Sequence, residues 1–219
     1  MIIPLLANAI ASRQASFDTS HESAFRLFNG FYEGYPDLAL DVYGHTLVIH
    51  NYADDPSQNQ IAIQEAITYL RTSLNWLRAG VLKTRNSVIQ DEKKGILIFG
   101  DKPDTKIKEH GVRYAIDLTT NRDASFYLDT RHLRKWLIDN MQGKSVLNTF
   151  AYTGSLGVAA MAGGASLTIQ TDRNGMFLNH AKDSCSLNGF PIHKNDFIAQ
   201  DFFPTVAKFK STKQFFDRV

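Results

Sequence analysis

The chain has 219 residues, of which 43% are hydrophobic and 21% charged, proportions typical of a soluble globular protein with a sizeable core. Lysine and arginine number 24 against 22 aspartate and glutamate, so the net charge of +2 gives no strong indication of nucleic-acid binding, although it leaves a local basic face open. The single cysteine, Cys185, excludes an internal disulfide and fits a reducing compartment. No apolar run approaches transmembrane length, so neither a membrane partner nor membrane insertion is expected.

The chain begins with an apolar segment, MIIPLLANAIA, that could be mistaken for an export signal. It lacks a basic leader and contains Pro4. We therefore interpret residues 1–23 as an N-terminal helix or packed arm.

Residues 24–105 are rich in strand patterns, with alternating apolar residues broken by turn residues. A tight turn at Gly44–His45 is expected to join two of the strands. The predicted elements are strands at Ala24–Leu27, Leu38–Tyr43 and Thr46–Tyr52, a helix at Ser57–Leu77, and strands at Val81–Thr84 and Gly95–Phe99. This pattern predicts a small α+β domain, followed by a polar linker at Gly100–Gly111.

Residues 106–219 change to an alternation of helices and strands. After a strand at Val112–Leu118, the predicted elements are Leu128–Met141, Ser145–Asn148, Ser155–Ala162, Ser166–Thr171, Gly175–Leu187 and Asp196–Ala199. Such alternation indicates parallel βαβ units, as in an α/β, Rossmann-like domain. Ligands of such sheets bind at the carboxyl ends of the strands.

The turn VLNTFAYTG, at residues 146–154, follows the first of these parallel strands. It matches neither GxGxxG nor GxxxxGK[ST], so neither the dinucleotide fingerprint nor the P-loop is present. Thr153 is the expected N-cap of the next helix, and Gly154 would let a ligand approach the backbone. From spacing alone, both a cofactor cradle and plain α/β architecture remain open.

Two aspartates follow the next two strands. Asp172 suits the two hydroxyls of a ribose, although an aspartate at a strand end is also a common turn former. Asp201 could accept a hydrogen bond from an adenine amino group while Phe202 covers the ring. The alternative is that Asp201 caps a helix and that Phe202 and Phe203 lie in the core.

The segment LDTR, at residues 128–131, is expected to open an amphipathic helix that turns Leu133, Trp136 and Leu137 inward. Asp129 and Arg131 could contact a cofactor or pair with each other. Cys185 is interpreted as a small core residue rather than a nucleophile. The seven histidines show no HxxxH or HExxH spacing, so no metal site is expected.

Several segments in this order resemble the class I S-adenosylmethionine-dependent rRNA methyltransferases. The subgroup includes large-subunit cytosine-5 methyltransferases and related guanine-N7 enzymes. The resemblance covers roughly residues 24–219, including the small domain at its start. It is carried by FRLFNGFYEGYPDLALDVYG, FYLDTR, GKSVLNTFAYTGSLGVAAMAGGA, TDRNGMFLNHAKDSCSLNGF, DFIAQDFF and FFDRV.

The resemblance implies a Rossmann-like methyltransferase domain that binds S-adenosylmethionine and takes ribosomal RNA as its substrate. Within the implied site, the turn after the first strand wraps the methionine end, Asp172 binds the ribose, and Asp201 with Phe202 forms the adenine pocket. Arg131 corresponds to the arginine of the LDxR motif beside the cofactor. The implied cofactor-binding residues are Arg131, Asn148, Phe150, Ala151, Tyr152, Thr153, Gly154, Asp172, Arg173, Asp201 and Phe202.

This chain departs from the family pattern after FFDRV, where an Asp-Pro-Pro loop and, in cytosine-5 members, a catalytic cysteine usually follow. We therefore name no catalytic residue and expect a C-terminally truncated domain without methyltransferase activity alone. The alternative function is a non-catalytic fragment that binds S-adenosylmethionine or RNA. A nicotinamide-dependent oxidoreductase is disfavoured by the missing glycine fingerprint. The expected compartment is the cytoplasm, or an organelle stroma or matrix in a eukaryote.

Overall fold

The computed structural model describes residues 2–219 and divides them into two compact units. Unit 1 comprises the chain up to Lys108 together with Asp117–Ala124, and unit 2 comprises Glu109–Ile116 and Ser125–Val219. The domain ranges expected from the sequence, 24–105 and 106–219, stay a prediction, because compactness does not test independent folding.

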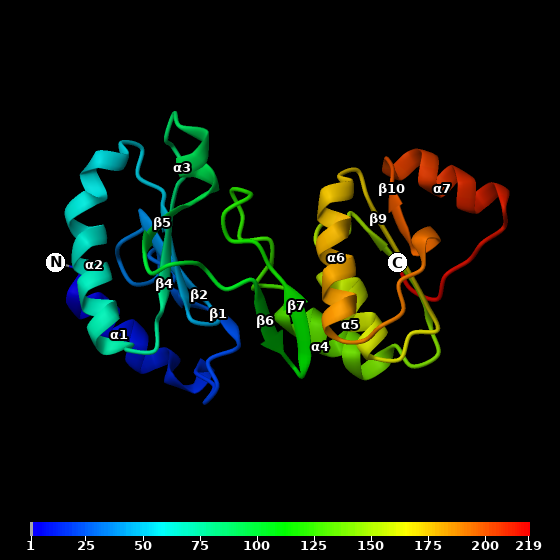
Figure 1. Cartoon of the computed structure of the whole chain (residues 1–219), viewed down its shortest axis with the longest axis horizontal. Helices are drawn as coiled ribbons and strands as arrows, with labels where there is room; N and C mark the ends of the chain where they lie inside the picture. Colours follow the sequence, from blue (N-terminus) through cyan, green and yellow to red (C-terminus); the bar gives the residue numbers. More distant parts are fainter. Residues whose placement is uncertain (1) are drawn as a thin grey trace. The chain divides into compact units, whose positions relative to one another are not determined.

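Unit 1 is built on a five-stranded sheet with the order β1-β2-β3-β4-β5 (Figure 1). Only β3 and β4 pair in parallel, and the other neighbours are antiparallel. The strands are β1 (Ala24–Phe28), β2 (Leu38–Tyr43), β3 (Thr46–Asn51), β4 (Ala79–Thr84) and β5 (Ile96–Phe99). The strands predicted for this region are therefore confirmed, including the turn at Gly44–His45 between β2 and β3.

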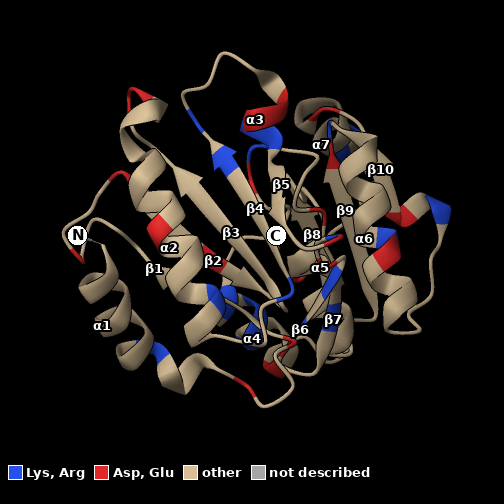
Figure 2. Cartoon of the chain, turned by 60° about the vertical axis from the view of Figure 1, so that its left-hand side comes forward, with Lys and Arg blue, Asp and Glu red and all other residues tan. Residues whose placement is uncertain are grey.

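Helices α1 (Ile3–Arg13) and α2 (Gln60–Ser73) cover one face of this sheet (Figure 2). Their apolar positions pack with inward residues of the strands in one core cluster, whose members include Leu6, Leu40, Val42, Ile49 and Leu70. In α2, buried Ile63, Ala66, Ile67 and Leu70 follow helical spacing. The periodicity that predicted this helix is thus the periodicity of the core contacts.

Two elements of this region were not predicted. Helix α3 (Gln90–Lys94) is a single short turn after β4, and β6 (Lys106–Glu109) lies within the segment expected to be a linker. β6 pairs with β7 (Val112–Ala115) in a two-stranded sheet. The linker prediction at Gly100–Gly111 is therefore wrong for its second half, because the outward lysines of KIKE resemble a loop while Ile107 and Glu109 are buried.

Unit 2 contains a parallel sheet with the order β10-β9-β8. The strands are β8 (Ser145–Thr149), β9 (Leu167–Asp172) and β10 (Phe197–Ala199). On the other side of β8, Arg218 forms a parallel bridge with Val146. Because β9 and Arg218 flank β8 on opposite sides, the carboxyl end of β8 lies where the strand order reverses, the usual place of a ligand crevice.

Four helices surround this sheet: α4 (Arg131–Asn140), α5 (Ser155–Ala162), α6 (Gly175–Leu187) and α7 (Phe202–Ser211). Val146 packs with residues of α4 and α5, whereas Leu147 packs with Phe209 of α7. Successive strand residues point to opposite faces, so these helices cover both sides of the sheet. Figure 1 accordingly shows α6 and α7 on opposite sides. None of the described helices is long and apolar enough to cross a membrane.

The orientation predicted for α4 is partly wrong. Leu137 is buried, but Leu133 and Trp136 are each 44% exposed, and Arg134 is fully buried. Arg134 takes the inward position because its Nε donates to Glu109 Oε1 over 2.6 Å and its guanidinium lies 4.0 Å from the centre of the Phe126 ring. A paired arginine therefore replaces the expected leucine and tryptophan on the inner face of α4.

Candidate functional site

The loop Thr149–Gly154 at the carboxyl end of β8 has an unusual backbone. Phe150 and Tyr152 have φ angles of +52° and +53°, and Gly154 has +76°. Non-glycine residues adopt this left-handed region at an energetic cost, and such strain concentrates at functional sites. The structure therefore marks the predicted turn as a loop held in a specific shape.

Three hydrogen bonds hold the loop in place. The Ala151 N–H donates to the carbonyl of Thr171, and the Tyr152 N–H donates to Asp172 Oδ2, each over 2.8 Å. Thr153 is buried, and its hydroxyl donates to the carbonyl of Ser125 over 2.6 Å. Thr153 is therefore not the N-cap that the sequence predicted.

Gly154 occupies the N-cap of α5 in the left-handed conformation. A Cβ at this position would overlap the Ala181 side chain and Gln170 Oε1, so only glycine fits without displacing these neighbours. The first helical hydrogen bond runs from the Val158 N–H to the Gly154 carbonyl. The N–H groups of residues 155–157 consequently have no acceptor within the helix and can bind an anionic group.

Asp172, at the end of β9, accepts one backbone hydrogen bond on each carboxylate oxygen. Oδ2 accepts from Tyr152, and Oδ1 accepts from the N–H of Asn174 over 2.8 Å. A carboxylate has about four acceptor positions, so the orientation is fixed while further acceptor capacity remains. Arg173 is exposed beside it. Asp172 thus braces the loop and can also accept hydroxyl groups of a ligand.

Asp201 caps α7, because its side chain accepts from the Phe203 N–H over 3.3 Å. The core placement of the following phenylalanines is wrong: Phe202 is half-buried and Phe203 is 77% exposed. The Phe202 ring instead stacks on Phe150, with centroids 5.1 Å apart. The structure therefore brings Phe202 to the loop, while Asp201 has a helix-capping role that leaves acceptor capacity.

Arg131 begins α4 and pairs with Glu109, with Nη1 and Oε2 3.2 Å apart. Glu109 also pairs with Arg134, and the side chains of that second pair are fully buried. Sequence analysis missed Glu109 because it lay in the predicted linker. The period-two pattern of Ile107 and Glu109 was the only available indication of a strand there.

Asn148 lies near the carboxyl end of β8, and its Nδ2 is 3.4 Å from Gln170 Oε1 on the neighbouring strand β9. Gln170 is fully buried beneath the loop and was not predicted as a site residue. It lies against Gly154 and Gly157, where an added Cβ would overlap its side chain, which explains why both positions are glycine. A buried glutamine in a strand gives no sequence signal of such a contact.

Cys185 shows none of the properties of a nucleophile. It is fully buried in α6, and burial raises the pKa of its thiol to about 12. Among residues 2–219, no cluster of histidine, cysteine, aspartate and glutamate has the arrangement of a metal site.

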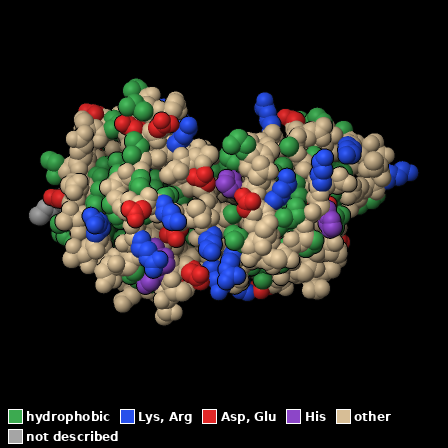
Figure 3. Space-filling model, viewed as in Figure 1, with side chains coloured by type: hydrophobic (Ala, Val, Ile, Leu, Met, Phe, Trp, Pro, Cys, Tyr) green, Lys and Arg blue, Asp and Glu red, His purple; other side chains and the backbone are tan. Residues whose placement is uncertain are grey.

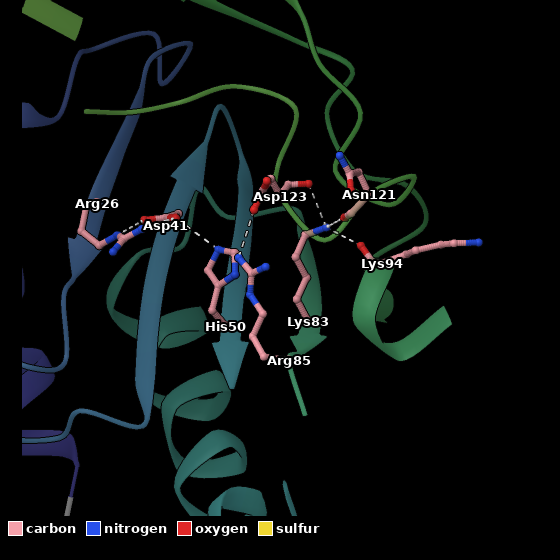
Figure 4. A network of polar contacts seen from close by, with 8 residues as sticks. All are labelled: Arg26, Asp41, His50, Lys83, Arg85, Lys94, Asn121 and Asp123. Carbon is pink, nitrogen blue, oxygen red and sulfur yellow. Dashed lines mark hydrogen bonds and ion pairs between the residues drawn. The ribbon is translucent and has the colours of Figure 1, made fainter. Parts of the chain in front are cut away.

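Unit 1 contains a second polar cluster, on the sheet face opposite α1 and α2 (Figure 4). Asp41 is paired with Arg26, and His50 Nε2 donates to Asp41 Oδ2 over 3.2 Å. Burial acts to raise the pKa of Asp41, but the hydrogen bonds from His50 and Arg26 outweigh it and lower the pKa. Asp41 is therefore an ionised carboxylate within the sheet.

Lys83 is the most buried charge of this cluster. Its ammonium donates to the carbonyls of Lys94, Asn121 and Asp123 (Figure 4). Burial, with a smaller effect of nearby Arg85, lowers the pKa of Lys83 to about 8. Since an ammonium has three donors, its hydrogen-bonding capacity is filled by the chain itself, which indicates a structural role.

Comparison with known proteins identifies the family. Residues 25–218 match the model of the S-adenosylmethionine-dependent methyltransferases. The chain is 27% identical over 198 residues to ribosomal RNA large subunit methyltransferase I of Photobacterium profundum, covering 90% of this chain and 50% of that protein. It is 33% identical over 191 residues to ribosomal RNA large subunit methyltransferase K/L of Colwellia psychrerythraea, covering 84% of this chain and 26% of that protein.

Solved structures show the same fold. A Streptococcus mutans protein assigned as a SAM-dependent methyltransferase aligns over 99% of this chain and 56% of its own, with a TM-score of 0.86 and 22% identity. A protein assigned as a methyltransferase and solved in complex with S-adenosylhomocysteine (SAH) aligns over 99% of this chain and 55% of its own, with a TM-score of 0.87 and 23% identity. The chain spans about half the length of the methyltransferase I relatives it matches. It belongs to the S-adenosylmethionine-dependent methyltransferase family.

Proposed function

We propose that unit 2 binds S-adenosylmethionine at the carboxyl end of β8, within a protein that methylates a base of ribosomal RNA. The observation that carries the proposal is the strained loop Thr149–Gly154, braced by Asp172 and followed by N–H groups of α5 that have no acceptor within the helix. The names of the rRNA methyltransferase relatives support the substrate class. S-adenosylmethionine supplies an electrophilic methyl group in such a reaction.

The residues present fit the chemical groups of this cofactor. Its carboxylate matches the N–H groups at the start of α5, where the helix dipole favours negative charge. Its ribose hydroxyls match the remaining acceptor positions of Asp172. Its adenine matches the acceptor oxygens of Asp201 and the ring of Phe202.

We assign the remaining predicted residues to the same site: Arg131, Asn148, Phe150, Ala151, Tyr152, Thr153, Gly154 and Arg173. For Phe150 to Thr153 the proposed contribution is the shape and backbone of the loop. We assign no catalytic residue. A non-catalytic protein that binds S-adenosylmethionine or RNA is the alternative, and a cytoplasmic location stays a prediction.

Calorimetric titration of the chain with SAH tests the cofactor site. Asp172→Asn should raise the dissociation constant about 10- to 150-fold, since a hydrogen bond to a charged group contributes about 1.5–3 kcal/mol. Asp183→Asn, an exposed carboxylate on α6, is the matched control and should bind SAH like the parent chain. Equal affinity of the parent and Asp172→Asn, or heat with NAD but not with SAH, would overturn the proposed site.

Substrate class is tested separately by methyl transfer. The full-length protein that carries this sequence should transfer labelled methyl groups to rRNA lacking the modification. Transfer to protein or DNA but not to rRNA would contradict the proposed substrate.

A further inference from the structure

Three phenylalanines of unit 2 form an aromatic row: Phe150, Phe202 and Phe203. Phe150 stacks on Phe202 with an interplanar angle of 23°, and Phe202 meets Phe203 edge-on with centroids 5.4 Å apart. The two outer members are open to solvent, with Phe150 72% and Phe203 77% exposed. Phe150 follows β8, and the other two follow β10 and begin α7.

The row is not explained by packing. Phe150 keeps its ring outside the core and so forgoes the stabilisation of burial, while its left-handed backbone conformation costs free energy. Adjacent exposed rings of this kind form an apolar patch, which in soluble proteins marks a binding surface. Phe202, the half-buried middle ring, is the one proposed to cover the cofactor's adenine, so the two exposed outer rings beside it face a molecule that approaches the bound cofactor.

Resting on the proposed function, we infer that the two exposed outer rings of the row, Phe150 and Phe203, form the surface on which an unpaired base of the RNA substrate stacks. A base inside a duplex is inaccessible to an enzyme that modifies it, so it must leave its stack and regain stacking on the protein. Aromatic side chains provide a stacking surface for any base. The cofactor is proposed to contact the backbone of the loop, whereas the Phe150 side chain is exposed to solvent and can contact the base.

The charges of α7, the helix that begins with Phe202 and Phe203, favour RNA over a protein partner. Lys208 and Lys210 of α7 and the following Lys213 are exposed, and they form no ion pair with any acidic side chain of residues 2–219. Figure 3 shows basic side chains protruding over α7. Aromatic rings together with unpaired lysines are the combination that binds single-stranded nucleic acid through bases and phosphates.

The test uses the 219-residue chain and a single-stranded RNA decamer that carries one 2-aminopurine base. Stacking of this base on an aromatic ring should quench its fluorescence, and anisotropy of a labelled decamer gives the affinity. Phe203→Leu and Phe150→Leu keep apolar side chains but remove the rings. Phe31→Leu, in the other unit, is the control, because Phe31 is 75% exposed and outside the row.

We expect the parent chain to bind the decamer and quench its fluorescence, and each row variant to weaken binding about 5- to 150-fold with loss of quenching. Phe31→Leu should change neither. A parent chain that binds no RNA, or row variants that bind and quench like the parent, would overturn the inference.

The SAH titration separates this inference from the proposed function. If Phe203→Leu loses SAH affinity while RNA binding is unchanged, the row belongs to the cofactor site and the inference is wrong. If RNA is quenched but SAH does not bind, the row stands and the proposed cofactor site fails.

Discussion

Units 1 and 2 both contain polar side chains at the carboxyl ends of parallel strands, but they use them differently. In unit 1, Lys83 at the end of β4 gives its donors to three backbone carbonyls of its own chain. In unit 2, Asp172 at the end of β9 accepts two backbone N–H groups and keeps acceptor capacity, beside a strained loop and exposed rings. The two side chains have similar positions in their sheets, but only Lys83 has its hydrogen-bonding capacity filled by the chain.

This difference separates a structural cluster from a candidate ligand site. A buried group whose capacity is filled by the chain stabilises the fold and has nothing left for a ligand. A group that is oriented by the chain but incompletely used is prepared for a ligand. The following variants test whether the two clusters divide in this way, beginning with the largest expected effect.

Glu109→Ala should destabilise the chain most, by about 3–5 kcal/mol, because it leaves the buried Arg134 guanidinium without its carboxylate. Urea unfolding measures the change. The control is Glu22→Ala, whose partner Lys108 lies 4.0 Å away at the surface, and it should change stability by less than about 1 kcal/mol. Similar losses in both variants would contradict the role of the buried pair.

Gly154→Ala should cost about 2–4 kcal/mol and weaken SAH binding, because it combines backbone strain with overlap of Ala181 and Gln170. Gly34→Ala isolates the strain, since Gly34 has a φ of +86° but no neighbour within 4 Å of an added Cβ. It should cost about 1–2 kcal/mol and leave SAH binding unchanged. Equal effects of the two variants would show that the close packing beneath the loop is unimportant.

Lys83→Met should reduce the free energy of unfolding by about 1–3 kcal/mol, because buried carbonyls lose their donor. Affinity for SAH should stay within twofold of the parent, and this is what distinguishes Lys83 from Asp172. Lys102→Met, at an exposed position, is the control for loss of a positive charge. Loss of SAH binding in folded Lys83→Met would break the proposed division between the units.

The smallest expected effect concerns the slope of stability against pH, and Asp41 should produce it in the acid range. Its folded-state pKa is lowered below the ordinary 3.8, so its contribution to stability is present above that value and is lost as pH falls through the lower folded-state pKa. Unfolding free energies measured from pH 5 to pH 2 should fall less steeply in Asp41→Asn than in the parent. Parallel pH profiles would contradict this assignment.

The sequence predicted what depends on local periodicity. The predictions from alternation in β2 and β3, from helical spacing in α2, and of the strand–turn–helix that begins with β8 were all correct. The apolar residues that form these patterns are the ones that pack in the core. It could not predict that Arg134 would turn inward, since that depends on Glu109, which is distant in sequence. Likewise, the Phe150–Phe202 stack joins the ends of two strands that only the fold brings together.

Amide hydrogen exchange with and without saturating SAH tests the central claim most directly, because it locates the ligand in one unit. The account predicts slower exchange in residues 150–157 and 172–174 of unit 2, and unchanged exchange in residues 46–52 and 79–86 of unit 1. Protection confined to unit 1, or SAH binding without protection of the loop after β8, would contradict it.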